Sequence, residues 1–190
     1  MAGMNASVIS DEVVLSRSRQ WLERAVIGLN LCPFAKSVHV KGQIRWVVSR
    51  AQTPEAVLEE LVRELRHLAE VDPELTDTTL LVLPEAFADF LDFNDFLDVA
   101  DAALEDLALD GVLQIANFHP NFQFADTDED DVTNNTNRAP WPTLHLIREA
   151  SIDRAVEVFP EAETIYERNM VLMRELGPEG WARLWDEPTA

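Results

Sequence analysis

His119, His145, Arg138 and several asparagines lie in one polar stretch of this chain, "ANFHPNFQFADTDEDDVTNNTNRAPWPTLHLIRE", residues 116 to 149. A neutral imidazole such as that of His119 or His145 can act as a general acid, a general base or a metal ligand near pH 7. The guanidinium of Arg138 and the asparagine amides bind carboxylates or phosphates directionally. The stretch therefore predicts a site for a small anionic molecule, in which one histidine moves a proton and Arg138 orients the anion.

Further residues belong to this predicted site because of their type and position. Each of these residues also has a possible structural role. A single histidine at a strand end is typically hydrogen-bonded within the fold, and Arg138 could hold its loop by binding backbone carbonyls. The residues predicted to bind the ligand beside Arg138 are Asn117, Asn121, Lys36 and Arg50.

A divalent metal is an alternative ligand of the same histidines. His119 and His145 would need a third ligand, for which Asp126, Glu85 or Cys32 is available. These residues do not stand at a diagnostic spacing, such as a histidine pair one helical turn apart. The metal site stays open as a hypothesis.

Cys32 is the single cysteine of the chain, which excludes an internal disulfide and a multi-cysteine zinc site. It follows a predicted helix, and the negative end of a helix dipole disfavours a thiolate. Lys36, four residues further on, or a histidine would have to offset that effect. We therefore favour a packed thiol over a catalytic nucleophile, which remains the alternative.

Local patterns predict the elements that must position these residues. Apolar stripes and capping residues predict helices at 11 to 31, 53 to 70, 87 to 109 and in the tail from 151, which is broken near Pro160 and ends at Gly177-Pro178. Short β-branched and aromatic runs predict strands at 44 to 49, 78 to 84, 111 to 118 and 142 to 149.

The order of these elements predicts an α/β fold, a single-domain mixed sheet of about four strands flanked by helices. Strands that alternate with helices favour three parallel strands. Because no crossover helix separates 111 to 118 from 142 to 149, that pair should be antiparallel. His119 and His145 would then lie side by side at the carboxyl edge of the sheet, where α/β folds bind ligands. The loop 120 to 141 would cover them.

Composition limits the partners of the chain. It has 190 residues, 47% of them hydrophobic, so one domain over 1 to 190 suffices, with flexible termini at 1 to 10 and 184 to 190. The 35 acidic and 15 basic residues give a net charge of −20, which opposes binding to nucleic acid or to an anionic membrane. Without an 18-residue apolar run or a secretory signal, the chain is expected to be cytoplasmic.

An acidic ribbon offers a different function. Asp89, Asp92, Asp95, Asp98 and Asp101 recur at every third position of the predicted helix 87 to 109. A solvated helix face explains this spacing well. The alternative is a docking surface for a basic protein partner, which would make the chain a non-catalytic interaction protein.

Three phrases carry a resemblance to a known family: "WLERAVIGLNLCPFAK", "NFHPNFQFAD" and "NRAPWPTLHLIRE". Together with the length of the chain, they resemble an uncharacterised bacterial family known as a domain of unknown function. The resemblance implies a stand-alone bacterial protein of about this size. It implies no activity, substrate, cofactor or catalytic residue, so an enzyme and a binding protein both stay open.

Overall fold

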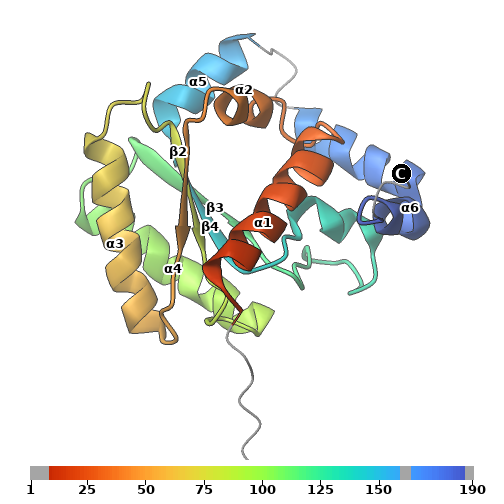
Figure 1. The fold of residues 1–190 in the computed structure, drawn as a ribbon, viewed down its shortest axis with the longest axis horizontal. Coiled ribbons are helices and arrows are strands. Elements are labelled where there is room, and N and C mark those ends of the chain that lie inside the picture. The colour runs from red at the N-terminus through yellow and green to blue at the C-terminus, as the bar shows by residue number, and fades with distance from the viewer. Residues whose placement is uncertain (1–8, 159–163, 187–190) are drawn as a thin grey trace, which may run out of the picture.

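A computed structural model describes residues 9 to 158 and 164 to 186 of the chain. It contains one four-stranded sheet with helices on both faces (Figure 1). In chain order the elements are α1 (Asp11–Trp21), η1 (Leu22–Ile27), α2 (Ala35–Val40), β1 (Ile44–Val48), α3 (Pro54–Glu70), β2 (Thr78–Val82), α4 (Phe90–Asp106), β3 (Leu113–Phe118), η2 (Val132–Asn137), β4 (Thr143–Arg148), α5 (Glu149–Val158) and α6 (Ile165–Arg183).

The longer helices begin at side chains that satisfy free backbone N–H groups. Ser10 caps α1, Thr53 caps α3 ahead of Pro54, and Asp89 caps α4 by accepting hydrogen bonds from two backbone N–H groups of the first turn. The first predicted helix continues from α1 into η1, a π-helical turn, in which the Gly28 N–H donates to the carbonyl of Glu23. Local sequence signals therefore account for these helices.

The sheet has the order β1-β2-β4-β3, with β1 and β2 parallel and β4 antiparallel to both of its neighbours. The predicted mixed α/β sheet and the antiparallel β3–β4 pair are confirmed. The prediction of three parallel strands is wrong, because β2 and β3 do not pair and the sheet has one parallel pair. After α4, strand β3 joins the sheet two positions away from β2, and β4 later takes the position between them. Central β4 buries Leu144 and Leu146, whereas β3 forms an edge at which Gln114 is exposed.

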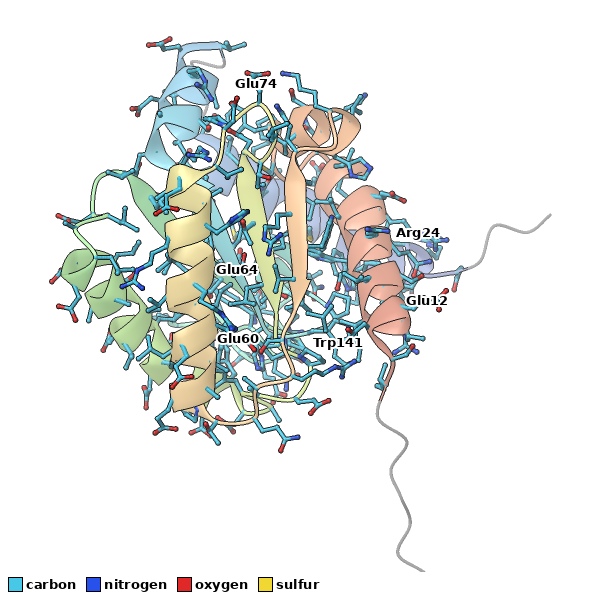
Figure 2. All side chains as sticks on the ribbon, turned by 60° about the vertical axis from the view of Figure 1, so that its left-hand side comes forward. Glu12, Arg24, Glu60, Glu64, Glu74 and Trp141 are labelled. Carbon is cyan, nitrogen blue, oxygen red and sulfur yellow. The ribbon has the colours of Figure 1, made fainter. Side chains whose placement is uncertain are left out.

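The two faces of the sheet carry separate cores. On one face, α3 and α4 bury leucines and phenylalanines such as Leu61 and Phe93. On the other, α1, η1 and the end of α6 bury Trp21 and its neighbours against β1 and β3. Figure 2 shows this division at the β1 edge, with Glu60 and Glu64 on α3 to one side and Glu12 on α1 and Arg24 on η1 to the other.

The first and last described residues of the chain form hydrogen bonds with the rest of the protein. Ser10 caps α1, and the Arg24 guanidinium binds the carbonyls of Leu184 and Asp186, both at 3.0 Å. The rest of the predicted flexible termini, 1 to 8 and 187 to 190, lies outside the described residues. The break predicted at Pro160 lies outside them as well. The predicted helix end at Gly177 is instead a kink, with a φ of 65°, and α6 continues to Arg183.

Candidate functional site

His119 is a buried residue whose two ring nitrogens are both occupied. Its side chain is 0% exposed, Nε2 donates to the carbonyl of Phe87 at 2.8 Å, and Nδ1 accepts from the Asn121 N–H at 3.0 Å. The ring packs against Phe90 and Phe93 of α4, with centroids 5.4 and 5.3 Å away. Burial lowers its pKa, so the ring is neutral at pH 7. These contacts leave no nitrogen for a ligand, and they hold the strand end on α4.

His145 lies on the other face of the sheet, and its hydrogen bonds determine its tautomer. The Thr78 hydroxyl donates its single proton to the carbonyl of Leu146 at 2.6 Å, so His145 Nε2–H donates to Thr78 Oγ1 at 2.7 Å. Nδ1 is therefore an acceptor. It takes no hydrogen bond from the described residues and is not sealed from solvent.

The predicted side-by-side pair of His119 and His145 is wrong. His145 pairs with Ala116, three residues before His119. Because side chains alternate between the two faces of a sheet, an odd offset places the two rings on opposite faces. The pairing of β3 with β4 was predicted correctly, but the register was not.

A cavity of about 370 Å³ lies over His145, between the sheet and the helices η1, α2 and α5; we call it the His145 cavity. Most of its wall is apolar, and a few polar groups stand on its floor and rim. Its lining residues are Trp21, Leu22, Val26, Cys32, Phe34, Ala35, Val38, Ile44, Asp77, Thr78, Leu80, Gln114, Ala116, Phe118, His145, Ile147, Ser151, Ile152 and Ala155.

The electrostatics of this cavity keep His145 uncharged. Burial lowers the pKa of His145 to about 4, because the apolar walls exclude the water that would solvate an imidazolium. At the rim, Ser151 Oγ donates to the carboxylate of Asp77 at 2.6 Å, and Arg154 donates to the same hydroxyl at 2.9 Å. The cavity thus offers one acceptor on its floor, His145 Nδ1, and a polar rim in which Asp77 is ion-paired with Arg154 at 3.7 Å.

Cys32 is half-buried and lines the same cavity. The hydrogen bonds of the described residues do not include one between its thiol and His145, so the geometry does not assemble an activated cysteine–histidine pair. Lys36, which the sequence places near it, is exposed on α2 and does not line the cavity.

Arg138 belongs to the loop between β3 and β4, which its side chain ties together. Nε donates to the carbonyl of Phe122 at 3.1 Å and Nη2 to that of Glu129 at 2.7 Å. Asn134, fully buried, accepts from the Phe124 N–H and donates to the carbonyl of Asp128, both at 2.9 Å. The loop is therefore held in one conformation by its own polar side chains.

A second cavity, of about 470 Å³, lies between this loop and the end of α6; we call it the tryptophan crevice. Trp21, 3% exposed, lines both cavities and so forms a common wall. The crevice is lined by tryptophans, prolines and a few polar residues: Trp21, Pro120, Asp130, Val132, Asn135, Arg138, Ala139, Pro140, Pro178, Trp181 and Trp185.

The remaining predicted ligand residues do not join either cavity. Arg50 makes ion pairs with Asp11 and with Glu85, the latter at 2.7 Å, and thereby connects the start of α1 to the loop after β2. Asn117 lies on β3, on the face opposite His145, and Asn121 is exposed and contributes its backbone N–H to His119. The single His/Arg/Asn site predicted from the sequence is therefore not assembled.

The proposed metal ligands are also dispersed. Within residues 9 to 158 and 164 to 186, no group of three or more His, Cys, Asp or Glu side chains is placed to hold a metal ion. Glu85 is engaged with Arg50 and Gln52, and Asp126 is exposed.

The acidic ribbon lies on the exposed side of α4. Asp92, Asp95 and Asp98 are exposed, and in the described part of the chain no ion pair involves them. Two apolar side chains, Leu91 and Val99, are exposed beside them at 69% and 43%. A basic partner for this surface stays a prediction.

Several cavity residues were not singled out by sequence reasoning. These are Trp21, Trp181 and Trp185, which line cavities. Trp181 and Trp185 are four residues apart, a spacing that places two side chains on the same face of a helix and is visible in the sequence. Thr78, which orients His145, is the first residue of a strand and carries no sequence signal of that role.

Comparisons with known proteins agree with the resemblance seen in the sequence. The model of a family described as "Protein of unknown function (DUF1415)" matches residues 13 to 183. The chain belongs to this family. A search of curated proteins and a search of solved structures found no match. None of the helices in the described part of the chain is long and apolar enough to cross a membrane.

Proposed function

We propose that this member of the DUF1415 family binds a small, uncharged and mostly apolar molecule in the His145 cavity. The observation that carries the proposal is the free acceptor Nδ1 of His145, in an apolar cavity of about 370 Å³. Pockets for small molecules are typically of this size and have few polar groups. A ligand hydroxyl or N–H that donates to Nδ1 would be oriented by it.

The lining of the cavity favours an uncharged ligand over an anion. Among the described residues that line it there is no Lys or Arg, and the charge of Asp77 is paired with Arg154 at 3.7 Å, so this lining has no free cation for an anion. The small anion predicted from the sequence is therefore not the ligand that we propose for this cavity, and Arg138 lies outside it.

Binding is better supported than acid–base catalysis at His145. A general base works best when its pKa lies near the working pH. A ring whose pKa is lowered to about 4 is a weak proton acceptor at pH 7, whereas it remains a good hydrogen-bond acceptor. The hypothesis of a catalytic histidine is thereby replaced by an orienting role.

Two probes test this proposal, a phenol and its O-methyl ether, which lacks the O–H donor. We expect p-cresol to bind more tightly than 4-methylanisole in ligand-observed NMR, because only the phenol can donate to His145 Nδ1. His145→Phe should remove this difference, and His67→Phe, on an exposed position of α3, should keep it. Ala116→Leu, which fills the cavity floor, should weaken both probes.

Folding of each variant is verified by its thermal unfolding. Binding of both probes that persists unchanged in His145→Phe and in Ala116→Leu would place any small-molecule site elsewhere and refute the proposal. Failure of both probes to bind the parent at millimolar concentration would do the same.

A further inference from the structure

We propose that the tryptophan crevice is a second binding site, specific for a small monocarboxylate with a flat apolar body. Its polar wall contains an asparagine whose amide is free of protein partners in the described part of the chain. Asn135 is 8% exposed and lines the crevice, yet its side chain makes no hydrogen bond in the described part of the chain. Its amide atoms are not sealed from solvent, so they are free to donate to and accept from a molecule that enters the crevice.

Arg138 supplies the charge that such a ligand needs. Its Nε and Nη2 bind neutral backbone carbonyls, and no carboxylate of the described residues forms an ion pair with it. Nη1 donates no hydrogen bond and is not sealed from solvent. The guanidinium is partly buried and feels the charge of Glu129 without forming an ion pair with it, so a bound carboxylate in direct contact would stabilise it further.

The apolar wall determines the shape of the ligand. The rings of Trp181 and Trp185 meet edge to face, with centroids 5.4 Å apart and planes at 77°. Gly177, with a φ of 65° and a ψ of 174°, kinks α6 just before them, a conformation open almost only to glycine. With Pro120, Pro140 and Pro178 in the same wall, the crevice suits a flat ring more than a flexible polar molecule.

Neighbouring charges restrict the ligand to one negative charge. Asp130 lines the crevice, and Glu129, adjacent to it, interacts with the Arg138 guanidinium. Together with the net charge of −20, these carboxylates oppose a dianion or a polyphosphate. One guanidinium can compensate one carboxylate.

Benzoate, benzamide and phthalate are the probes, and the five tryptophan indole N–H signals in a ¹⁵N correlation spectrum are the readout. We expect benzoate to shift the signals of Trp181 and Trp185 and to leave that of Trp46 unchanged. Benzamide, which has the same ring without the charge, and phthalate, which has two charges, should bind about tenfold more weakly or not at all.

Variants connect the binding to the two polar groups. Arg138→Gln should weaken benzoate by at least about tenfold, and Asn135→Leu should weaken it as well. Arg63→Gln removes the same charge from an exposed position on α3 and should have no effect. Because Arg138 also holds its loop, Asn135→Leu keeps the test valid if Arg138→Gln fails to fold.

The site is independent of the His145 cavity, so His145→Phe should leave benzoate binding unchanged. Benzoate that binds with equal affinity in Asn135→Leu and Arg138→Gln, or that shifts no crevice tryptophan in the parent, would overturn the inference. Equal binding of benzoate and benzamide would overturn its carboxylate specificity.

Discussion

His145 should make the stability of this protein fall between about pH 6.5 and pH 4. The pKa of the imidazole is about 6.5 in an unfolded chain, and burial lowers it to about 4 in the folded protein. Within that window the unfolded chain binds a proton that the folded protein does not. Stability is therefore complete above pH 6.5 and is lost progressively as the pH falls towards 4.

The size of the effect follows from the difference between the two pKa values. One pKa unit corresponds to about 1.36 kcal/mol, so the full difference represents roughly 3 kcal/mol near pH 4 and roughly 2 kcal/mol at pH 5. That is a large part of the free energy of unfolding of a typical domain, about 5 to 15 kcal/mol. Water that reaches part of the ring through the cavity makes the loss smaller than for a fully sealed ring.

His145→Phe separates this contribution from those of all other groups. The phenyl ring cannot titrate and loses the hydrogen bond to Thr78, which should cost about 1 kcal/mol at pH 7. The carboxylates and His119 are present in both proteins, so their contributions cancel in the comparison. Between pH 7 and pH 5 the variant should gain roughly 2 kcal/mol relative to the parent.

Urea unfolding at pH 7, 6 and 5 measures the difference, and the histidine Cε1–H signals in NMR report the pKa of His145 directly. The reasoning would be refuted by unfolding free energies of parent and variant that change in parallel with pH. It would also be refuted by a His145 signal that titrates near pH 6.5.

Three substitutions give further expected outcomes, each measured by urea unfolding at pH 7. Ala116→Leu, on the floor of the His145 cavity, should change the free energy of unfolding by less than about 1 kcal/mol. Ala100→Leu, in the close-packed core, should lower it by about 1 to 3 kcal/mol. Equal losses in the two variants would mean that the cavity is filled. Asn134→Ala should cost about 1 to 3 kcal/mol, because the backbone groups of the loop lose their partners, and a neutral result would contradict the scaffold role. His119→Ala should be about as damaging as Leu61→Ala, roughly 3 kcal/mol, and a harmless His119→Ala would restore it as a candidate site residue.

Local signals predicted much of the fold. The cap at Thr53, the apolar stripe of α3 and the β-branched runs are properties of short segments, and they predicted the corresponding elements to within a few residues. The short helix α2 and the η2 turn inside the loop lack such signals and were not predicted. The prediction of three parallel strands was wrong because nothing in β2 or β3 alone indicates that β4 will lie between them.

The candidate site was predicted only in part. The long loop and Arg138 were identified from their composition, and Arg138 does line a cavity. His119 and His145 were grouped because they lie near strand ends, whereas His119 is a buried structural residue and His145 lies inside β4 on the other face. Residue type and proximity in the sequence cannot distinguish a free imidazole from one whose nitrogens are both bonded.

By itself, the sequence determined the mixed α/β class, the antiparallel relation of β3 and β4, the acidic charge and the resemblance to a family of unknown function. Tertiary structure alone decided the register of that pair, the faces on which His119 and His145 lie, and the separation of the His145 cavity from the tryptophan crevice. The physical reason is the two-residue period of a strand. A one-residue difference in register, set by contacts between distant segments, moves a side chain from one face of the sheet to the other.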